Sequence, residues 1–179
     1  MGAHVRDGPR RVHPLGRDGG AAMANLPDFP VHGGCACGAV RYRLIRAPYA
    51  VYTCHCTDCQ TLTASVFSLN GVVQAEDLEI VSGELTMWLR TAESGARIPQ
   101  HVCGHCGVRI FTEPPDGSGT QTLRLGTLDD TSWLVPSAAI FMKSAQLWVR
   151  MPEGTLLYDQ GPADFMPIIA KWREMMGLG

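Results

Sequence analysis

Seven cysteines stand out among the residues of this 179-residue chain that could do chemistry. Three of them fall within the stretch Cys54-His55-Cys56-Thr57-Asp58-Cys59-Gln60, and the other four form a CxC pair and a CxxC pair. Thiols at these spacings are typical of metal ligands, and zinc in a closed structural site takes four ligands in tetrahedral geometry. The two pairs therefore predict one closed zinc site, with these ligands: Cys35, Cys37, Cys103 and Cys106.

The remaining cysteines, Cys54, Cys56 and Cys59, cannot fill a tetrahedral zinc shell by themselves. They predict a second zinc with one position open to water or to a substrate. A thiol that enters this position binds as a thiolate, because the charge of the metal favours loss of its proton. Zinc thiolates remain nucleophilic and can attack an electrophilic carbon without a separate strong base. We interpret the three cysteines, called the trio below, as the catalytic group.

Other interpretations of the cysteines stay open on spacing alone. Each pair could form a disulfide or a redox couple. A fourth ligand could close the trio site, for which His55, His101 and His105 are the candidates, although His55 lies between two ligands and is expected to point away. The trio could also act as metal-free redox thiols. Glycines beside both pairs favour a shared metal, because they let the backbone turn two thiolates toward one point: Gly33, Gly34, Gly38, Gly104 and Gly107.

The order of these motifs resembles a known family, the glutathione-dependent formaldehyde-activating enzymes, also called the CENP-V/GFA domain. The resemblance covers roughly residues 31–159 and lies in four motifs: Gly33-Gly34-Cys35-Ala36-Cys37-Gly38-Ala39-Val40-Arg41-Tyr42, Cys54-His55-Cys56-Thr57-Asp58-Cys59-Gln60, Cys103-Gly104-His105-Cys106-Gly107 and Gly126-Thr127-Leu128-Asp129-Asp130. It implies a mainly β, Mss4-like fold, a structural zinc on the two pairs and a second zinc on the trio. The implied reaction joins glutathione to formaldehyde and gives S-hydroxymethylglutathione.

The chain departs from the family pattern at Thr61, Ala64 and Ala139. Members often carry a basic residue, a glycine and a histidine near these positions, which we expect to line the substrate pocket. The resemblance therefore supports a zinc-dependent carbon–sulfur lyase more strongly than it supports formaldehyde itself. The alternative from a different class is a zinc-stabilised Mss4-like interaction module without catalytic activity.

Short apolar segments separated by turn residues predict the elements that position these sites, and they favour a sandwich or a similar mainly β fold. An Asn70-Gly71 step predicts a hairpin turn between two of the strands. The expected strands cover residues 39–45, 65–69, 72–73, 78–81, 85–89, 98–102, 108–111, 121–125, 138–142, 147–149 and 156–158.

The C-terminus shows a different pattern. Apolar residues recur at helical spacing there, and Asp164 is placed to cap the start of a short helix that packs on the sheet. The apolar positions are Phe165, Ile168, Ile169, Trp172 and Met176.

Composition limits both the domain organisation and the partners. Residues 1–24 are rich in Gly, Arg and Pro and predict a disordered tail, whereas 25–179 predict a single zinc-binding domain. The chain is 45% hydrophobic with a net charge of -2, which argues against a general nucleic-acid binder. Metal-binding thiols must be reduced, so a cytoplasmic location is expected. No secretory h-region and no apolar run long enough for a bilayer is present in the sequence, so neither secretion nor a membrane span is expected. The partners that the resemblance implies are a small thiol such as glutathione and an aldehyde.

Charged residues near the motifs carry weaker predictions. Arginines could bind an anionic thiol such as glutathione, but we interpret them as solvated strand edges. Asp58 could orient a ligand or a substrate amine. Asp129 and Asp130 are interpreted as a turn that bonds its own backbone. The four arginines considered are Arg90, Arg97, Arg109 and Arg124.

Overall fold

The computed structural model describes residues 25–92 and 95–178, so the tail predicted for 1–24 lies outside the described residues. The described chain is mainly β with a short C-terminal helix, α2 (Met166–Met175), which confirms the predicted fold class. That 25–179 forms a single domain stays a prediction. No helix in the described part has the length and apolar character needed to cross a membrane.

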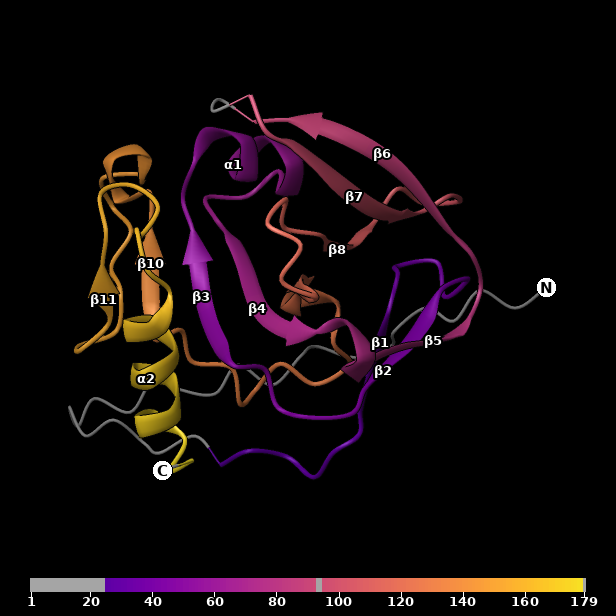
Figure 1. Cartoon of the computed structure of the whole chain (residues 1–179), viewed down its shortest axis with the longest axis horizontal. Coiled ribbons are helices and arrows are strands. Elements are labelled where there is room, and N and C mark those ends of the chain that lie inside the picture. The colour runs from indigo at the N-terminus through magenta and orange to yellow at the C-terminus, as the bar shows by residue number, and fades with distance from the viewer. Residues whose placement is uncertain (1–24, 93–94, 179) are drawn as a thin grey trace.

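Most of the strands belong to one large curved sheet (Figure 1). Its central strands are antiparallel, and β10 runs parallel to both of its neighbours, β3 and β11. The order across the sheet is β11 (Leu156–Leu157), β10 (Ala138–Ile140), β3 (Ala50–Cys54), β4 (Ser68–Gln74), β9 (Thr120–Arg124), β8 (Arg109–Thr112), β7 (Arg97–Cys103) and β6 (Leu85–Thr91).

A smaller sheet carries the first cysteine pair. It is antiparallel and has the order β1 (Val31–Gly34), β2 (Arg41–Leu44), β5 (Leu78–Ser82). The predicted alternation is confirmed in β2, where Tyr42 and Leu44 are buried and Arg43 is exposed. Short 3-10 turns connect several strands: Ala75–Asp77, Leu125–Thr127 and Met142–Ser144.

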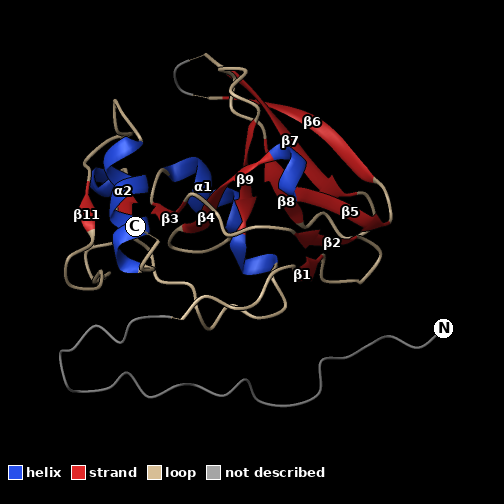
Figure 2. Cartoon of the chain, turned by 60° about the horizontal axis from the view of Figure 1, so that its bottom comes forward, coloured by secondary structure: helices blue, strands red, loops and turns tan. Residues whose placement is uncertain are grey.

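Helix α2 covers β3 at one end of the large sheet (Figures 1 and 2). Its Trp172 is fully buried, and the indole N–H donates to the carbonyl oxygen of Pro48 at 3.0 Å. The carboxylate of Asp164 accepts a hydrogen bond from the backbone N–H of Met166, so it caps the first turn as predicted. Packing against β3 therefore fixes the strand that ends in the first cysteine of the trio.

A second helix, α1 (Thr57–Thr63), connects β3 to β4 and was not predicted. Cys56 is its N-cap, and its sulfur accepts a hydrogen bond from the backbone N–H of Cys59 at 3.3 Å. Side-chain acceptors at this position stabilise a helix start. The helix is thus begun by one member of the trio and carries another.

The hairpin predicted at Asn70-Gly71 is wrong, because β4 runs straight through these residues. The Asn70 side chain is buried, and its oxygen accepts hydrogen bonds from Ser68 and Arg124 instead of closing a turn. Gly71 is required by close packing, since a Cβ there would lie 2.9 Å from a methyl carbon of Leu125. Tertiary contacts have overridden the local turn preference.

The strand predicted at 147–149 is also wrong. The segment is a turn in which the Val149 N–H donates to the carbonyl oxygen of Gln146 at 3.0 Å. Leu147 and Trp148 are exposed, with relative accessibilities of 95% and 69%. The apolar character of the segment led to the prediction of a buried strand. Because no described strand pairs with it, it forms an exposed turn instead.

Candidate metal centres

The two cysteine pairs lie on backbone loops that share one geometry. In each loop the N–H of the first cysteine donates to the carbonyl oxygen of a valine five residues later, at 3.0 Å for Cys35 and 2.9 Å for Cys103. A glycine after the second cysteine has positive φ, 78° at Gly38 and 72° at Gly107, which an L side chain adopts only with strain. The sequence folds both pairs into knuckles because a glycine stands at this position in each.

The two knuckles meet although they lie far apart in the sequence. Their four sulfurs, from Cys35, Cys37, Cys103 and Cys106, all lie within 4.8 Å of one another. The Cys37 and Cys103 sulfurs are 3.8 Å apart, and the Cys35 and Cys37 sulfurs 3.5 Å. Four thiolates around a tetrahedral zinc, with bonds of about 2.3 Å, are separated by about 3.8 Å. The group could hold a metal ion, and the donor set fits zinc.

The trio gathers where β3 passes into α1. Cys54 ends the strand, Cys56 caps the helix and Cys59 lies in its first turn. The three sulfurs lie within 4.8 Å of one another, and those of Cys54 and Cys56 are 3.6 Å apart. A strand end followed by a helix start therefore converts a CxCxxC spacing into three converging donors, which could also hold a metal ion.

Electrostatics in the trio also favour a bound cation. The Cys54 thiol donates to the Cys56 sulfur, which lowers the pKa of Cys56 far below its usual range, with a smaller contribution from Cys59. The same hydrogen bond raises the pKa of Cys54. Neighbouring thiols cannot all ionise in the absence of a compensating charge. A divalent cation provides that charge, so the residues present fit a metal.

No fourth metal-ligating side chain joins the trio within residues 25–92 and 95–178. His55 is buried and points away as expected, with its Nε2 3.0 Å from the hydroxyl of Thr53. His101 stacks on Phe111, with ring centroids 4.2 Å apart, and His105 is exposed on the second knuckle. The three histidines considered as a fourth ligand are therefore all outside the group.

A small cavity of about 110 Å³ opens beside the trio. Cys54 and Cys59 form part of its wall, so two of the three cysteines of the trio border open space. This volume suits a molecule of a few heavy atoms, since one water takes about 30 Å³ of liquid. A small reactant can thus reach the sulfurs.

Three of the four arginines considered above surround this cavity rather than lying on solvated strand edges. Arg90, Arg109 and Arg124 line it, whereas Arg97 is exposed. Arg90 is paired with the carboxylate of Asp58. The interpretation of Arg90, Arg109 and Arg124 as surface residues is therefore wrong, because the sheet curves and brings β6, β8 and β9 around α1.

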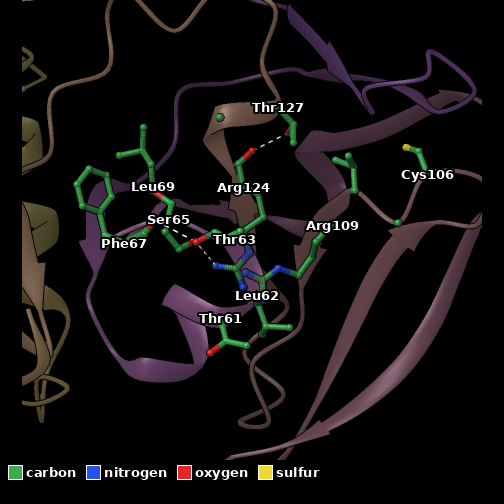
Figure 3. Close-up of a pocket in the computed structure, with 15 residues that line it drawn as sticks. Thr61, Leu62, Thr63, Ser65, Phe67, Leu69, Cys106, Arg109, Arg124 and Thr127 are labelled. Atoms are coloured by element: carbon green, nitrogen blue, oxygen red, sulfur yellow. Dashed lines mark hydrogen bonds between the residues drawn. The ribbon is translucent and has the colours of Figure 1, made fainter.

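A larger groove of about 540 Å³ lies on the other side of the same arginines (Figure 3). Thr61 and Ala64, two of the positions where the sequence departs from the family pattern, line this groove, and that they line the substrate pocket stays a prediction. Ala139 is instead buried within β10. Arg109 and Arg124 line both the groove and the cavity, so they stand between the open surface and the trio.

Polar residues that hold the arginines were missed from the sequence. Gln100 accepts a hydrogen bond from Arg109 at 2.9 Å, and Asn70 accepts one from Arg124. A buried polar side chain inside a strand is the signal that could have identified them, because such groups require partners. The Asp130 carboxylate accepts from the backbone N–H of Ser132 at 2.8 Å, which confirms the predicted turn for this residue. The Asp129 carboxylate is instead paired with Arg41, so its predicted role in the turn is wrong.

Comparison with known proteins gives a family match and several relatives. The model of the family "Glutathione-dependent formaldehyde-activating enzyme" matches residues 30–144, more than half of the chain. A crystal structure of a Rhodobacter sphaeroides protein is similar with a TM-score of 0.44 and 19% identity, covering 56% of this chain and 89% of that chain.

Curated relatives bear the provisional name of a glutathione-dependent formaldehyde-activating enzyme. One from Colletotrichum graminicola is 26% identical over 107 residues, which is 58% of this chain and 55% of the relative. One from Aspergillus terreus is 30% identical over 97 residues, 52% of this chain and 49% of the relative. One from Halomonas elongata is 28% identical over 89 residues, 48% of this chain and 57% of the relative. The chain spans about half the length of the curated relatives it matches.

Proposed function

The chain belongs to the glutathione-dependent formaldehyde-activating enzyme family, and from this premise we propose that it is a zinc-dependent carbon–sulfur lyase. Its reactants are a thiol such as glutathione and a small aldehyde, and its product is an S-hydroxymethyl-type thiol adduct. It binds two zinc ions per chain, a structural one on the two knuckles and a catalytic one on the trio. The reduced thiols place the activity in a reducing compartment such as the cytoplasm.

One observation supports this proposal: among the described residues the trio has no fourth ligand, and two of its cysteines line a cavity. A closed structural site has its four positions filled by protein, whereas a catalytic zinc site keeps one open. The two cysteine groups of this chain differ in this way. The contrast supports structural and catalytic roles for the two groups.

In the proposed mechanism Cys54, Cys56 and Cys59 hold the catalytic zinc. When bound, the metal stabilises the thiolate form of an incoming thiol. The thiol gives up its S–H proton, a sulfur–carbon bond forms as the carbonyl double bond opens, and the carbonyl oxygen takes up a proton. The cavity holds the small aldehyde next to the sulfur of the thiol, and proximity of this kind accounts for a large part of the rate gain in two-substrate reactions.

Cobalt substitution tests the open position directly. Cobalt-thiolate absorption in the visible range is recorded for the wild type and for Cys56→Ser, before and after addition of glutathione. We expect two metals per wild-type chain and one in Cys56→Ser, and we expect glutathione to change the spectrum of the wild type only. A spectrum that no thiol changes would overturn the catalytic assignment.

The same experiment separates the lyase from the interaction module. A module stabilised by zinc has no position for an exogenous thiol, so its cobalt spectrum stays constant and it does not accelerate adduct formation. A redox sensor would instead lose metal reversibly on oxidation of the trio.

A further inference from the structure

Arg109 and Arg124 are cations without a carboxylate partner among the described ion pairs of the structure. Arg109 donates to the amide oxygen of Gln100 at 2.9 Å. Arg124 donates to three neutral side-chain oxygens, those of Ser68, Asn70 and Thr112. Neutral acceptors orient the two guanidinium groups but do not neutralise their charge.

Each of the two arginines also has a buried nitrogen without a hydrogen-bond partner, Nη2 of Arg109 and Nε of Arg124. Buried polar groups in native proteins are nearly always paired, so each orphan donor calls for an explanation. Burial, together with the charge of the neighbouring Arg124, lowers the pKa of Arg109 to about 10. The folded chain therefore maintains two like charges in a partly desolvated place, and the neighbouring trio cysteines offset only part of this cost.

The position of Arg109 and Arg124 brings their unpaired donors close to the proposed reactants. Both side chains line the small cavity that Cys54 and Cys59 also line, and they line the larger groove beside α1. Figure 3 shows that the two side chains approach each other from different strands, close to Leu62 in this view. Arg90 also lines the cavity, but Asp58 already neutralises it. The positive charge without a described carboxylate partner is thus concentrated at Arg109 and Arg124.

We propose that Arg109 and Arg124 form a carboxylate-binding subsite next to the trio. A guanidinium group presents parallel N–H donors that match the two oxygens of a carboxylate, which makes arginine well suited to this anion. A bound carboxylate accepts from the orphan donors and compensates the two positive charges. The subsite deepens the proposed function and rests on it, because the carboxylate belongs to one of the two reactants.

Either reactant can supply this carboxylate. The thiol can lie in the groove with its own carboxylate on the pair, as the roughly 540 Å³ of space allows. Alternatively, the aldehyde can carry a carboxylate on its carbonyl carbon. Such a compound is a 2-oxo acid, and one with only a few heavy atoms suits the cavity of about 110 Å³. Arg109 and Arg124 are positioning residues in both cases.

Calorimetric titration of the zinc-loaded protein distinguishes the two sources. One arm compares glutathione with its diester, which has the same body without the carboxylates. The other arm compares glyoxylate with glycolaldehyde, a neutral aldehyde of similar size. Both arms are repeated with Arg109→Gln and with Arg97→Gln, which removes the same charge from an exposed position of β7. Arg124→Lys provides a second variant that keeps the charge and loses the fork.

In one of the two arms, we expect the wild type to bind the charged ligand more tightly than the neutral one. This ratio of affinities should fall about tenfold to a hundredfold in Arg109→Gln, as for the loss of charge-assisted hydrogen bonds. Arg97→Gln should keep the preference. No preference in either arm, or one that survives in both Arg109→Gln and Arg124→Lys, overturns the subsite. Glyoxylate binding without any thiol binding would leave the subsite standing and refute the proposed lyase.

Discussion

Replacing one ligand in each cysteine group should separate a structural from a catalytic metal. A metal shared by Cys37 and Cys103 cross-links positions that are 66 residues apart. By the chain-entropy relation used for disulfides, a cross-link over this distance stabilises the fold by about 4 kcal/mol. A cross-link from Cys54 to Cys59 closes a loop of about five residues and contributes about 2 kcal/mol by the same relation. Direct metal–ligand bonding adds to both figures.

The test compares Cys103→Ser with Cys56→Ser. The second substitution is the gentler one, because a serine hydroxyl can accept the N-cap hydrogen bond that the Cys56 sulfur now accepts from Cys59. A chain of this length loses about 2–4 °C of Tm per kcal/mol, so Tm should fall by at least about 8–16 °C in Cys103→Ser and by at least about 4–8 °C in Cys56→Ser. Thermal unfolding followed by circular dichroism, with zinc content by mass spectrometry, measures both. Equal losses of Tm would refute the division of roles.

Further predictions concern metal removal and packing. A strong chelator should extract one zinc equivalent well before the second, with loss of thiol binding but little change in far-ultraviolet circular dichroism. Gly71→Ala should cost about 1–3 kcal/mol in denaturant unfolding, because its Cβ would overlap a buried leucine, whereas Gly126→Ala has open space and should be close to neutral. Trp172→Phe should cost about 1–3 kcal/mol, because it leaves the buried carbonyl group of Pro48 unpaired, whereas Trp148→Phe at an exposed position should change stability by less than about 0.5 kcal/mol.

Features that depend on local sequence were predicted well. The alternation in β2 and the C-terminal helix follow from periodicity, which short-range sterics and burial impose directly on the chain. The convergence of the cysteines also follows from local rules, because the CxC and CxxC knuckles turn on themselves. The proximity of Cys35 to Cys103 was predicted from the four ligands that a closed zinc site takes. Chain geometry alone does not indicate it.

Features that depend on tertiary contacts were not predicted. Asn70-Gly71 has strong turn preferences, but a buried arginine and a close leucine hold it in a strand. Arg109 and Arg124 look like surface residues in sequence, because nothing local shows that the sheet curves around α1. A basic residue inside an apolar strand next to metal ligands is the pattern that should have indicated an interior position.

The two cysteine groups show why the chemistry is proposed for the trio and not for the four-thiolate group. A catalytic metal must change its ligands during each turnover, and a change of ligands at a long-range cross-link would weaken the fold each time. The four-thiolate group connects distant segments, so its coordination has to stay constant. The trio lies within six residues on a strand end and a helix start, both of which α2 and the sheet stabilise independently. Its metal can therefore gain and lose a ligand at little cost in folding free energy, as an open site requires.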